Sequence, residues 1–251
     1  MLLLPRELQP LCDEFLDGLK TALGGKLHGV YLHGAVLFPD AGPTKDVDFH
    51  VVVGEPLTPG ECRELDRLDQ DLNRRFFPET GDGLDCYYIL LADARLSAPP
   101  VHQRNLEISD GSWALHRAHM LAGRCVVLMG PEPEQLFLAP SWPELAAALR
   151  HELEWIENGL DSYPAYCVLN LCRVMHSFAT KEVVISKRGA ATGIGTAYPV
   201  WGPSIAAAKR WYEDRATDSD DRLLSSQMGR FRRFALGRIY ESPHWIPDEC
   251  R

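Results

Sequence analysis

The sequence predicts an α/β domain with a mixed sheet, followed by an all-α helical bundle domain. Over the first hundred residues, segments with apolar residues at helical spacing alternate with short β-branched segments. From about residue 112 onward the pattern is mostly helical. Between the two patterns lies a cluster of prolines, Pro131, Pro133, Pro140 and Pro143. We therefore expect one domain over residues 1–135 and a second over residues 141–251.

The elements of the first domain are expected in the order helix, strand, loop, strand, helix, strand. The first helix covers residues 5–23, and Gly24-Gly25 ends it. The clearest strand is Asp46 to Val53, which is β-branched at its end. A capping box at Thr58 to Glu61, with proline at the first helical position, begins a helix that reaches Phe76. The other segments are a strand over 29–34, a Pro- and Gly-rich loop over 35–45 and a strand over 84–91.

The second domain reads as a series of amphipathic helices. Ser141 to Glu144 is another capping box, and it opens a helix that ends at Asn158-Gly159. Further helices are expected over residues 164–182, 203–215 and 220–240. Residues 230–238 of the last helix carry four arginines, which we interpret as a solvated or ion-paired face.

Composition narrows the classes of partner. A formal net charge of −9 argues against nucleic acid as the partner, since polyanion binding relies on Lys and Arg neutralising phosphates. The apolar opening Met1 to Leu4 is too short for a signal peptide and no apolar stretch has membrane-spanning length, so we expect neither a signal peptide nor a membrane span. Its 7 cysteines form no Cys-x-x-Cys pair, which is typical of buried thiols in a reducing compartment. We expect a cytoplasmic protein, a monomer or weak dimer.

Asp46-Val47-Asp48 is the motif most suggestive of chemistry. Residues i and i+2 of a strand point to the same face, so both carboxylates project together. Their mutual repulsion is relieved when a cation lies between them, and Mg²⁺ prefers such oxygen ligands together with substrate phosphates. The alternative is a pair of solvated acids at an exposed strand edge.

Two further features strengthen the metal interpretation. Gly34 and Ala35 form a turn just before the loop, where backbone N–H groups can approach phosphates. Asp85 opens the next predicted strand, where an acid can share a metal or accept the proton of an attacking hydroxyl. The alternative for Asp85 is a turn acid that supports the Gly81 to Gly83 turn.

The run from Gly29 to Ala35, followed by Lys45 to Val53, resembles the signature of the polymerase-beta-like nucleotidyltransferase superfamily. Two later segments are similar to elements of the streptomycin/spectinomycin aminoglycoside adenylyltransferases. These are Gly130-Pro131 with Leu136-Phe137, and Leu169 to Arg173 with Lys187 to Ala190.

This resemblance implies a nucleotidyltransferase domain and a helical domain that closes over its cleft. It implies transfer of AMP from ATP, with two Mg²⁺, to a hydroxyl of a small cationic acceptor such as an aminoglycoside or aminocyclitol antibiotic. Asp46 and Asp48 match its metal ligands and Asp85 matches its catalytic base. Gly34 and Ala35 match the phosphate-binding turn, and the basic residues that reach the nucleotide's phosphates are matched by Arg173 and Lys187. Without the resemblance, both would read as solvated surface cations.

The chain departs from the family at two positions. Ala35 stands where the family usually has serine, and Asp85 stands where the adenylyltransferases usually have glutamate. These departures motivate an alternative hypothesis, a nucleotide-binding sensor or antitoxin-like module that transfers nothing.

Two other signals are interpreted without a functional role. His116 and His119 lie three apart on an expected helix, but no third ligand at suitable spacing is evident, so zinc is not predicted. Trp113 is interpreted as a packing residue of the core.

Overall fold

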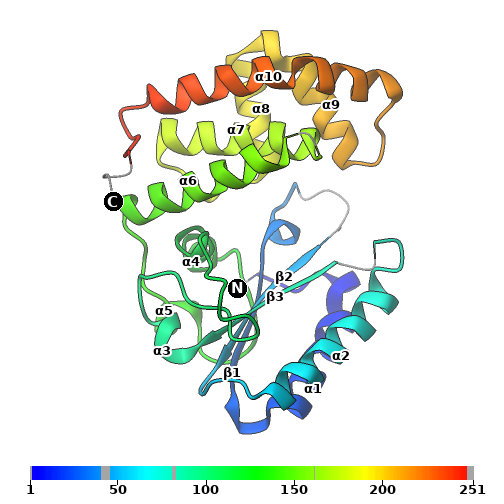
Figure 1. Ribbon diagram of the computed structural model, residues 1–251, viewed down its shortest axis with the longest axis vertical. Helices are drawn as coiled ribbons and strands as arrows, with labels where there is room; N and C mark the ends of the chain where they lie inside the picture. Colours follow the sequence, from blue (N-terminus) through cyan, green and yellow to red (C-terminus); the bar gives the residue numbers. More distant parts are fainter. Residues whose placement is uncertain (1, 41–45, 81–82, 161, 248–251) are drawn as a thin grey trace. The chain divides into compact units, whose positions relative to one another are not determined.

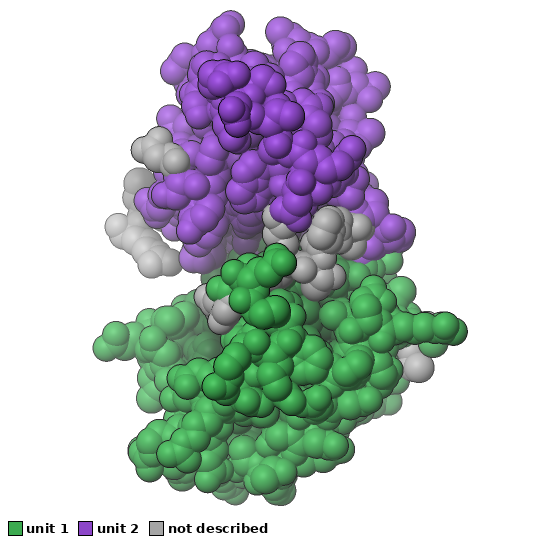
Figure 2. All heavy atoms as spheres, turned by 90° about the vertical axis from the view of Figure 1, so that its right-hand side faces the viewer, with its two compact units in different colours: residues 1–37, 44–140 green, residues 38–43, 141–251 purple. Residues whose placement is uncertain are grey.

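The computed structural model describes residues 2–40, 46–80, 83–160 and 162–247 (Figure 1). The chain forms two compact units, which Figure 2 shows in different colours. Unit 1 comprises residues 1–37 and 44–140, and unit 2 comprises residues 38–43 and 141–251. Each unit has its own set of secondary-structure elements.

Unit 1 is built on a four-stranded mixed sheet in the order β3-β2-β1-β4. Strands β1 (Leu27–His33) and β2 (Val47–Val53) pair antiparallel, and β3 (Leu84–Leu90) joins β2 in parallel. Strand β4 (Val126–Met129) pairs antiparallel with the other edge of β1. The α/β class and the first three strands were predicted, whereas the four-residue β4 was missed.

Helices cover both faces of the sheet (Figure 1). On one face lie α1 (Gln9–Leu23) and α2 (Pro59–Phe76), which close a core with inward residues such as Phe15, Phe49 and Leu65. On the other face are α3 (Leu91–Ala94), α4 (Trp113–Leu121) and α5 (Pro133–Leu136). Trp113 is fully buried there, as the packing interpretation expected. Because side chains alternate along each strand, each face of the sheet has its own core.

Local sequence signals account for the helix ends. The predicted capping box at α2 is present, with the Thr58 side chain bonded to the N–H of Glu61 and the Glu61 carboxylate bonded to the N–H of Thr58. The first predicted helix is split, because a short 3-10 turn over Arg6–Leu8 precedes α1. The predicted loop after β1 contains a 3-10 turn over Ala35–Leu37, and its residues 41–45 lie outside the described residues.

Unit 2 is helical, with α6 (Trp142–Gly159), α7 (Pro164–Thr180), α8 (Lys187–Ala197), α9 (Gly202–Tyr212) and α10 (Asp218–Tyr240). Helix α7 contacts each of the other four and buries apolar residues around most of its circumference, including Val168, Leu171 and Phe178. A helix that is apolar on all sides lies at the centre of a bundle. The helical domain was predicted, whereas α8 was read as a turn element.

None of the described helices combines the length and apolar character that a membrane crossing requires. The described cysteines carry free thiols, and all of them except Cys62 are buried.

Candidate functional site

The sheet register aligns polar residues of three strands on one face. Asp48 of β2 pairs with His33 of β1 on one side and with Asp85 of β3 on the other. Residues in register on neighbouring strands project from the same face of a sheet. The structure therefore brings two of the three sequence-predicted acids together, although they lie 37 positions apart in the chain.

Gly34 directly follows β1 and lies against Asp48. Its φ is +87°, in the left-handed region, and a Cβ at this position would lie 1.7 Å from Asp48 Oδ2. The Asp48 carboxylate therefore occupies the space that a side chain at residue 34 would take. Ala35 follows as an exposed residue at the start of the 3-10 turn, whose Leu37 N–H donates to the Gly34 carbonyl at 3.3 Å. The predicted glycine turn and the predicted Asp-x-Asp strand thus meet in space.

Asp46 stands immediately before β2 and is exposed. It acts on Asp85 electrostatically. The pKa of the Asp85 carboxyl is raised above its ordinary value by partial loss of solvation, and by Asp46 and Asp110, while His116 and His50 oppose the shift. A carboxylate whose charge is disfavoured by neighbouring carboxylates gains from a cation. Its oxygens are also the ligands that Mg²⁺ prefers, so the chemistry of these residues fits magnesium, although the ligand atoms of Asp46, Asp48 and Asp85 do not all lie within 4.8 Å of one another.

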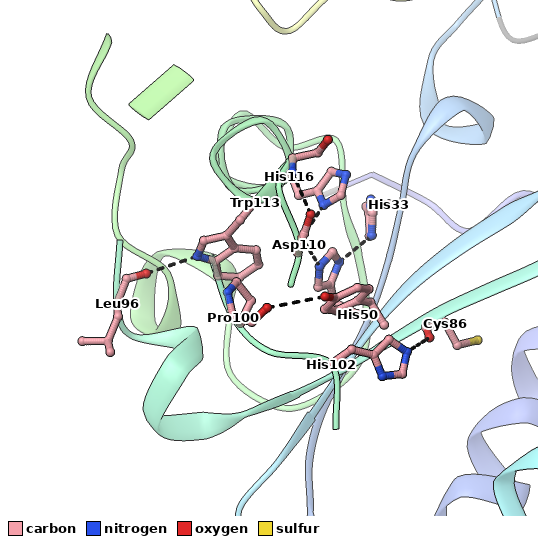
Figure 3. Close-up of polar contacts among 11 residues, drawn as sticks. His33, His50, Cys86, Leu96, Pro100, His102, Asp110, Trp113 and His116 are labelled. Atoms are coloured by element: carbon pink, nitrogen blue, oxygen red, sulfur yellow. Dashed lines mark hydrogen bonds and ion pairs between the residues drawn. The ribbon is translucent and has the colours of Figure 1, made fainter. Parts of the chain in front are cut away.

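Beside the acids lies a polar cluster that was not predicted from the sequence, in which His33 is in register with Asp48 and His50 follows Asp48 by two residues (Figure 3). His50 Nδ1 is 2.6 Å from His33 Nε2, and His50 Nε2 is 3.2 Å from Asp110 Oδ2. The same carboxylate oxygen lies 2.8 Å from His116 Nδ1. We call His33, His50, His116 and Asp110 the histidine cluster. One sequence signal was available, because His50 follows Asp48 by two residues and must share its face.

Burial and charge set the protonation of this cluster. Burial lowers the pKa of His33 and of His50, so both rings are held neutral. Burial alone would raise the pKa of Asp110, but contacts with His116 and His50 hold it well below its ordinary value. Asp110 is therefore a carboxylate that accepts hydrogen bonds from two imidazoles.

Asp85 also borders a cavity of about 450 Å³ beside β3 and α2. Asp66 and Asp69 line the same cavity, and both form ion pairs with Arg104. The cavity is large enough to admit part of a small polar molecule next to the Asp85 carboxylate.

The two predicted phosphate-binding cations belong to unit 2. Arg173 on α7 forms an ion pair with Glu152 of α6, with Nη2 and Oε2 2.6 Å apart. Lys187 is the first residue of α8, after the N-cap Ser186, and its Nζ lies 4.0 Å from the centroid of the Tyr166 ring. Arg173 thus contacts α6 through Glu152, and Lys187 contacts α7 through Tyr166.

Comparison with known proteins agrees with this architecture. Residues 136–237 match the family described as aminoglycoside adenylyltransferase, C-terminal domain. The crystal structure of spectinomycin adenyltransferase AAD(9) from Enterococcus faecialis with ATP and spectinomycin superposes with a TM-score of 0.74 at 17% sequence identity. The match covers 93% of this chain and 99% of that one. No curated protein matches the chain. The chain therefore shares the fold of this adenyltransferase, and its helical part matches a domain of the aminoglycoside adenylyltransferases.

Proposed function

We propose that the chain transfers AMP from ATP, with Mg²⁺, to a hydroxyl of a small cationic acceptor of the aminoglycoside or aminocyclitol class. The observation that carries the proposal is the meeting of Asp48, Asp85 and Gly34 on one face of the sheet. Support comes from the fold shared with a structure that holds ATP and spectinomycin. Further support is the net charge of −9, which suits a cationic acceptor better than an anionic one.

Each site residue has a role in this reaction. Asp46 and Asp48 hold the metal ions, which when bound neutralise the triphosphate and stabilise the leaving pyrophosphate. The backbone N–H groups of Gly34 and Ala35 donate to phosphate oxygens. Arg173 and Lys187 bind the triphosphate through their charges.

Asp85 serves as the general base. The acceptor oxygen forms a bond to the α-phosphorus, the bond from that phosphorus to the bridging oxygen breaks, and pyrophosphate leaves with that electron pair. The proton of the acceptor hydroxyl passes to Asp85. A carboxylate with a raised pKa accepts a proton more readily than an ordinary one, so the environment of Asp85 suits this task.

The experiment measures pyrophosphate release from ATP and Mg²⁺ across a panel that includes spectinomycin, streptomycin and other aminoglycosides. We expect release with at least one acceptor and loss of release when EDTA removes the metal. Asp46→Asn and Asp48→Asn should each lower the rate more than about 100-fold, because a metal contributes several kcal/mol to the transition state. Asp17→Asn, an exposed acid on α1 in an ion pair with Lys20, is the matched control and should leave the rate unchanged.

The proposal would be contradicted if the chain bound nucleotide but released no pyrophosphate with any acceptor in the panel. That result would favour a binding module that transfers nothing. Full activity of Asp48→Asn at saturating Mg²⁺ would contradict the metal assignment while leaving the transfer reaction standing.

A further inference from the structure

The histidine cluster gathers three imidazoles from three separate elements. His33 ends β1, His50 lies in the middle of β2 and His116 lies on α4. One ring nitrogen from each lies within 4.8 Å of the others. Among the described residues, these three histidines are the one group of three or more residues whose possible metal-ligand atoms lie this close together. Asp46, Asp48 and Asp85 do not form such a group. Imidazole nitrogen suits zinc and related transition metals, whereas Mg²⁺ takes oxygen ligands.

Asp110 fixes which nitrogen each ring presents. Its Oδ2 accepts from His50 Nε2 at 3.2 Å and from His116 Nδ1 at 2.8 Å, while its Oδ1 accepts from the Ser112 N–H at 3.0 Å (Figure 3). A neutral imidazole that donates from one nitrogen offers a lone pair on the other. Because Asp110 accepts from His50 Nε2 and His116 Nδ1, the atoms that offer lone pairs to a metal are His50 Nδ1 and His116 Nε2. A carboxylate bonded to the far nitrogen of a ligating histidine is the usual support of a metal site.

The distance between His33 and His50 fits a shared proton that a cation can replace. Their facing nitrogens are 2.6 Å apart, so one proton lies between two lone pairs. Zinc–nitrogen bonds of about 2.0–2.1 Å at tetrahedral angles place two ligand nitrogens about 3.3 Å apart. Binding would therefore require these two rings to separate by less than about 1 Å, and the shared proton to move to the other nitrogen of His33, which keeps that ring neutral. The His116 side chain is 30% exposed, which provides the route of entry that the buried His50 lacks.

We propose that His33, His50 and His116 form a binding site for a zinc-class transition metal, supported by Asp110 and separate from the carboxylate magnesium site. Three histidines leave a fourth position for water or a polar ligand. The bound ion would tie α4 to strands β1 and β2. This proposal rests on the cluster's own geometry and stands whether or not the chain transfers AMP.

The test titrates the purified chain with Co²⁺ in excess Mg²⁺, which fills the carboxylate site, and follows the visible d–d bands. We expect bands of a four- or five-coordinate nitrogen site, saturating at one Co²⁺ per chain and displaced by Zn²⁺. His116→Gln should abolish them. His151→Gln, which changes an exposed histidine of α6, should leave them unchanged. Asp110→Asn should weaken binding by about 10–100-fold, because supporting carboxylates contribute that much to metal affinity.

Thermal unfolding in EDTA and in Zn²⁺ gives an independent readout. Zinc should raise the Tm of the wild-type chain, since a ligand that binds only the folded state stabilises it, and it should not raise the Tm of His116→Gln. Two results would overturn the proposal: a wild-type chain that binds neither ion, or Co²⁺ bands that persist in His116→Gln. If His116→Gln does not fold, Asp110→Asn decides, and unchanged affinity in that variant overturns the proposal.

Discussion

Gly34 is the residue at which the backbone and the site depend on each other most directly. Its φ of +87° and the 1.7 Å between a Cβ and Asp48 Oδ2 impose two separate demands. The positive φ would strain an alanine at this position, and the Cβ of the alanine would displace the Asp48 carboxylate. We expect Gly34→Ala to lower the rate of pyrophosphate release by at least about 10-fold, a cost of about 1.4 kcal/mol in the transition state.

Gly123 offers a control for the strain alone. Its φ is +79°, yet nothing lies within 4 Å of the position of its Cβ. Gly123→Ala should therefore lower stability by about 1–2 kcal/mol without changing the rate per folded molecule. Equal losses of activity in the two variants, measured at equal folded fractions, would show that the Asp48 carboxylate does not depend on Gly34.

Individual residues differ in how far the sequence predicted them. The period of two in a strand predicted that Asp46 and Asp48 share a face, but β2 begins only at Val47, so the rule applies within the strand to Asp48 and His50. It does not reach Asp110 or His116, because these come from a loop and a helix about 60 residues later. Only the packing of α4 on the sheet brings them to His50. That packing also places the His116 ring centroid 4.9 Å from that of His33 and 5.1 Å from that of His50.

At the scale of elements, the parallel register of β2 and β3 decides the properties of Asp85. It places Asp85 in register with Asp48, where loss of solvation first, and then the charges of Asp46 and Asp110, raise the pKa of the Asp85 carboxyl. Folding therefore favours the neutral form, and the folded chain binds this proton more tightly than the unfolded chain. The protonated Asp85 contributes this stability fully below its ordinary pKa of 3.8. The contribution is lost as the pH rises through the raised pKa of the folded chain.

At neutral pH the charged Asp85 carboxylate destabilises the folded chain. Asp85→Asn removes this destabilisation and also removes the proposed base. In EDTA at neutral pH we expect the Tm to rise by about 1–3 °C, a modest gain because solvent screens a partly exposed carboxyl. Pyrophosphate release should fall by about 100-fold or more. Asp85→Glu keeps a carboxylate at this position and should retain much of the rate. A lower Tm for Asp85→Asn would contradict the assigned electrostatics, and an unchanged rate would contradict the role as base.

The elements that the sequence missed are short or poor in signal. Strand β4 has four residues, too few for a periodic pattern, and it exists because β1 offers it an edge. Helix α8 contains Gly189, Gly193 and Gly195, which lower helix propensity. Its start is secured by the Ser186 hydroxyl, which accepts from the Gly189 N–H at 2.8 Å. Longer elements with strong periodicity or a capping box, such as α2 and α6, were predicted to within a residue.

At the scale of the whole molecule, the change from alternating to mostly helical patterning predicted two kinds of architecture in one chain. Sheet order was not predictable, because it depends on which strand edges meet rather than on any local pattern. Net charge raises a further question at this scale. A chain with a formal charge of −9 that binds a triphosphate, as we propose, needs local cations, and Arg173 and Lys187 are the residues proposed for this role.

Arg173 already has an anionic partner, so its role needs a test that separates binding from structure. The Arg173 and Glu152 side chains are 15% and 16% exposed, and removing one alone leaves a largely buried charge. Glu152→Gln leaves the guanidinium in place and should leave the KM for ATP within about 2-fold of wild type. The double variant Arg173→Met with Glu152→Gln should raise that KM by about 10–100-fold, since hydrogen bonds to charged groups contribute about 1.5–3 kcal/mol.

Arg230→Ala, on the exposed surface of α10, controls for the loss of one positive charge and should not change the KM for ATP. Fluorescent-nucleotide binding without acceptor should follow the KM values, because the loss lies in binding and not in the chemical step. If the ion pair is purely structural, Glu152→Gln and the double variant will show the same KM and differ only in stability. That result would remove Arg173 from the nucleotide site while leaving the carboxylates of unit 1 in their proposed roles.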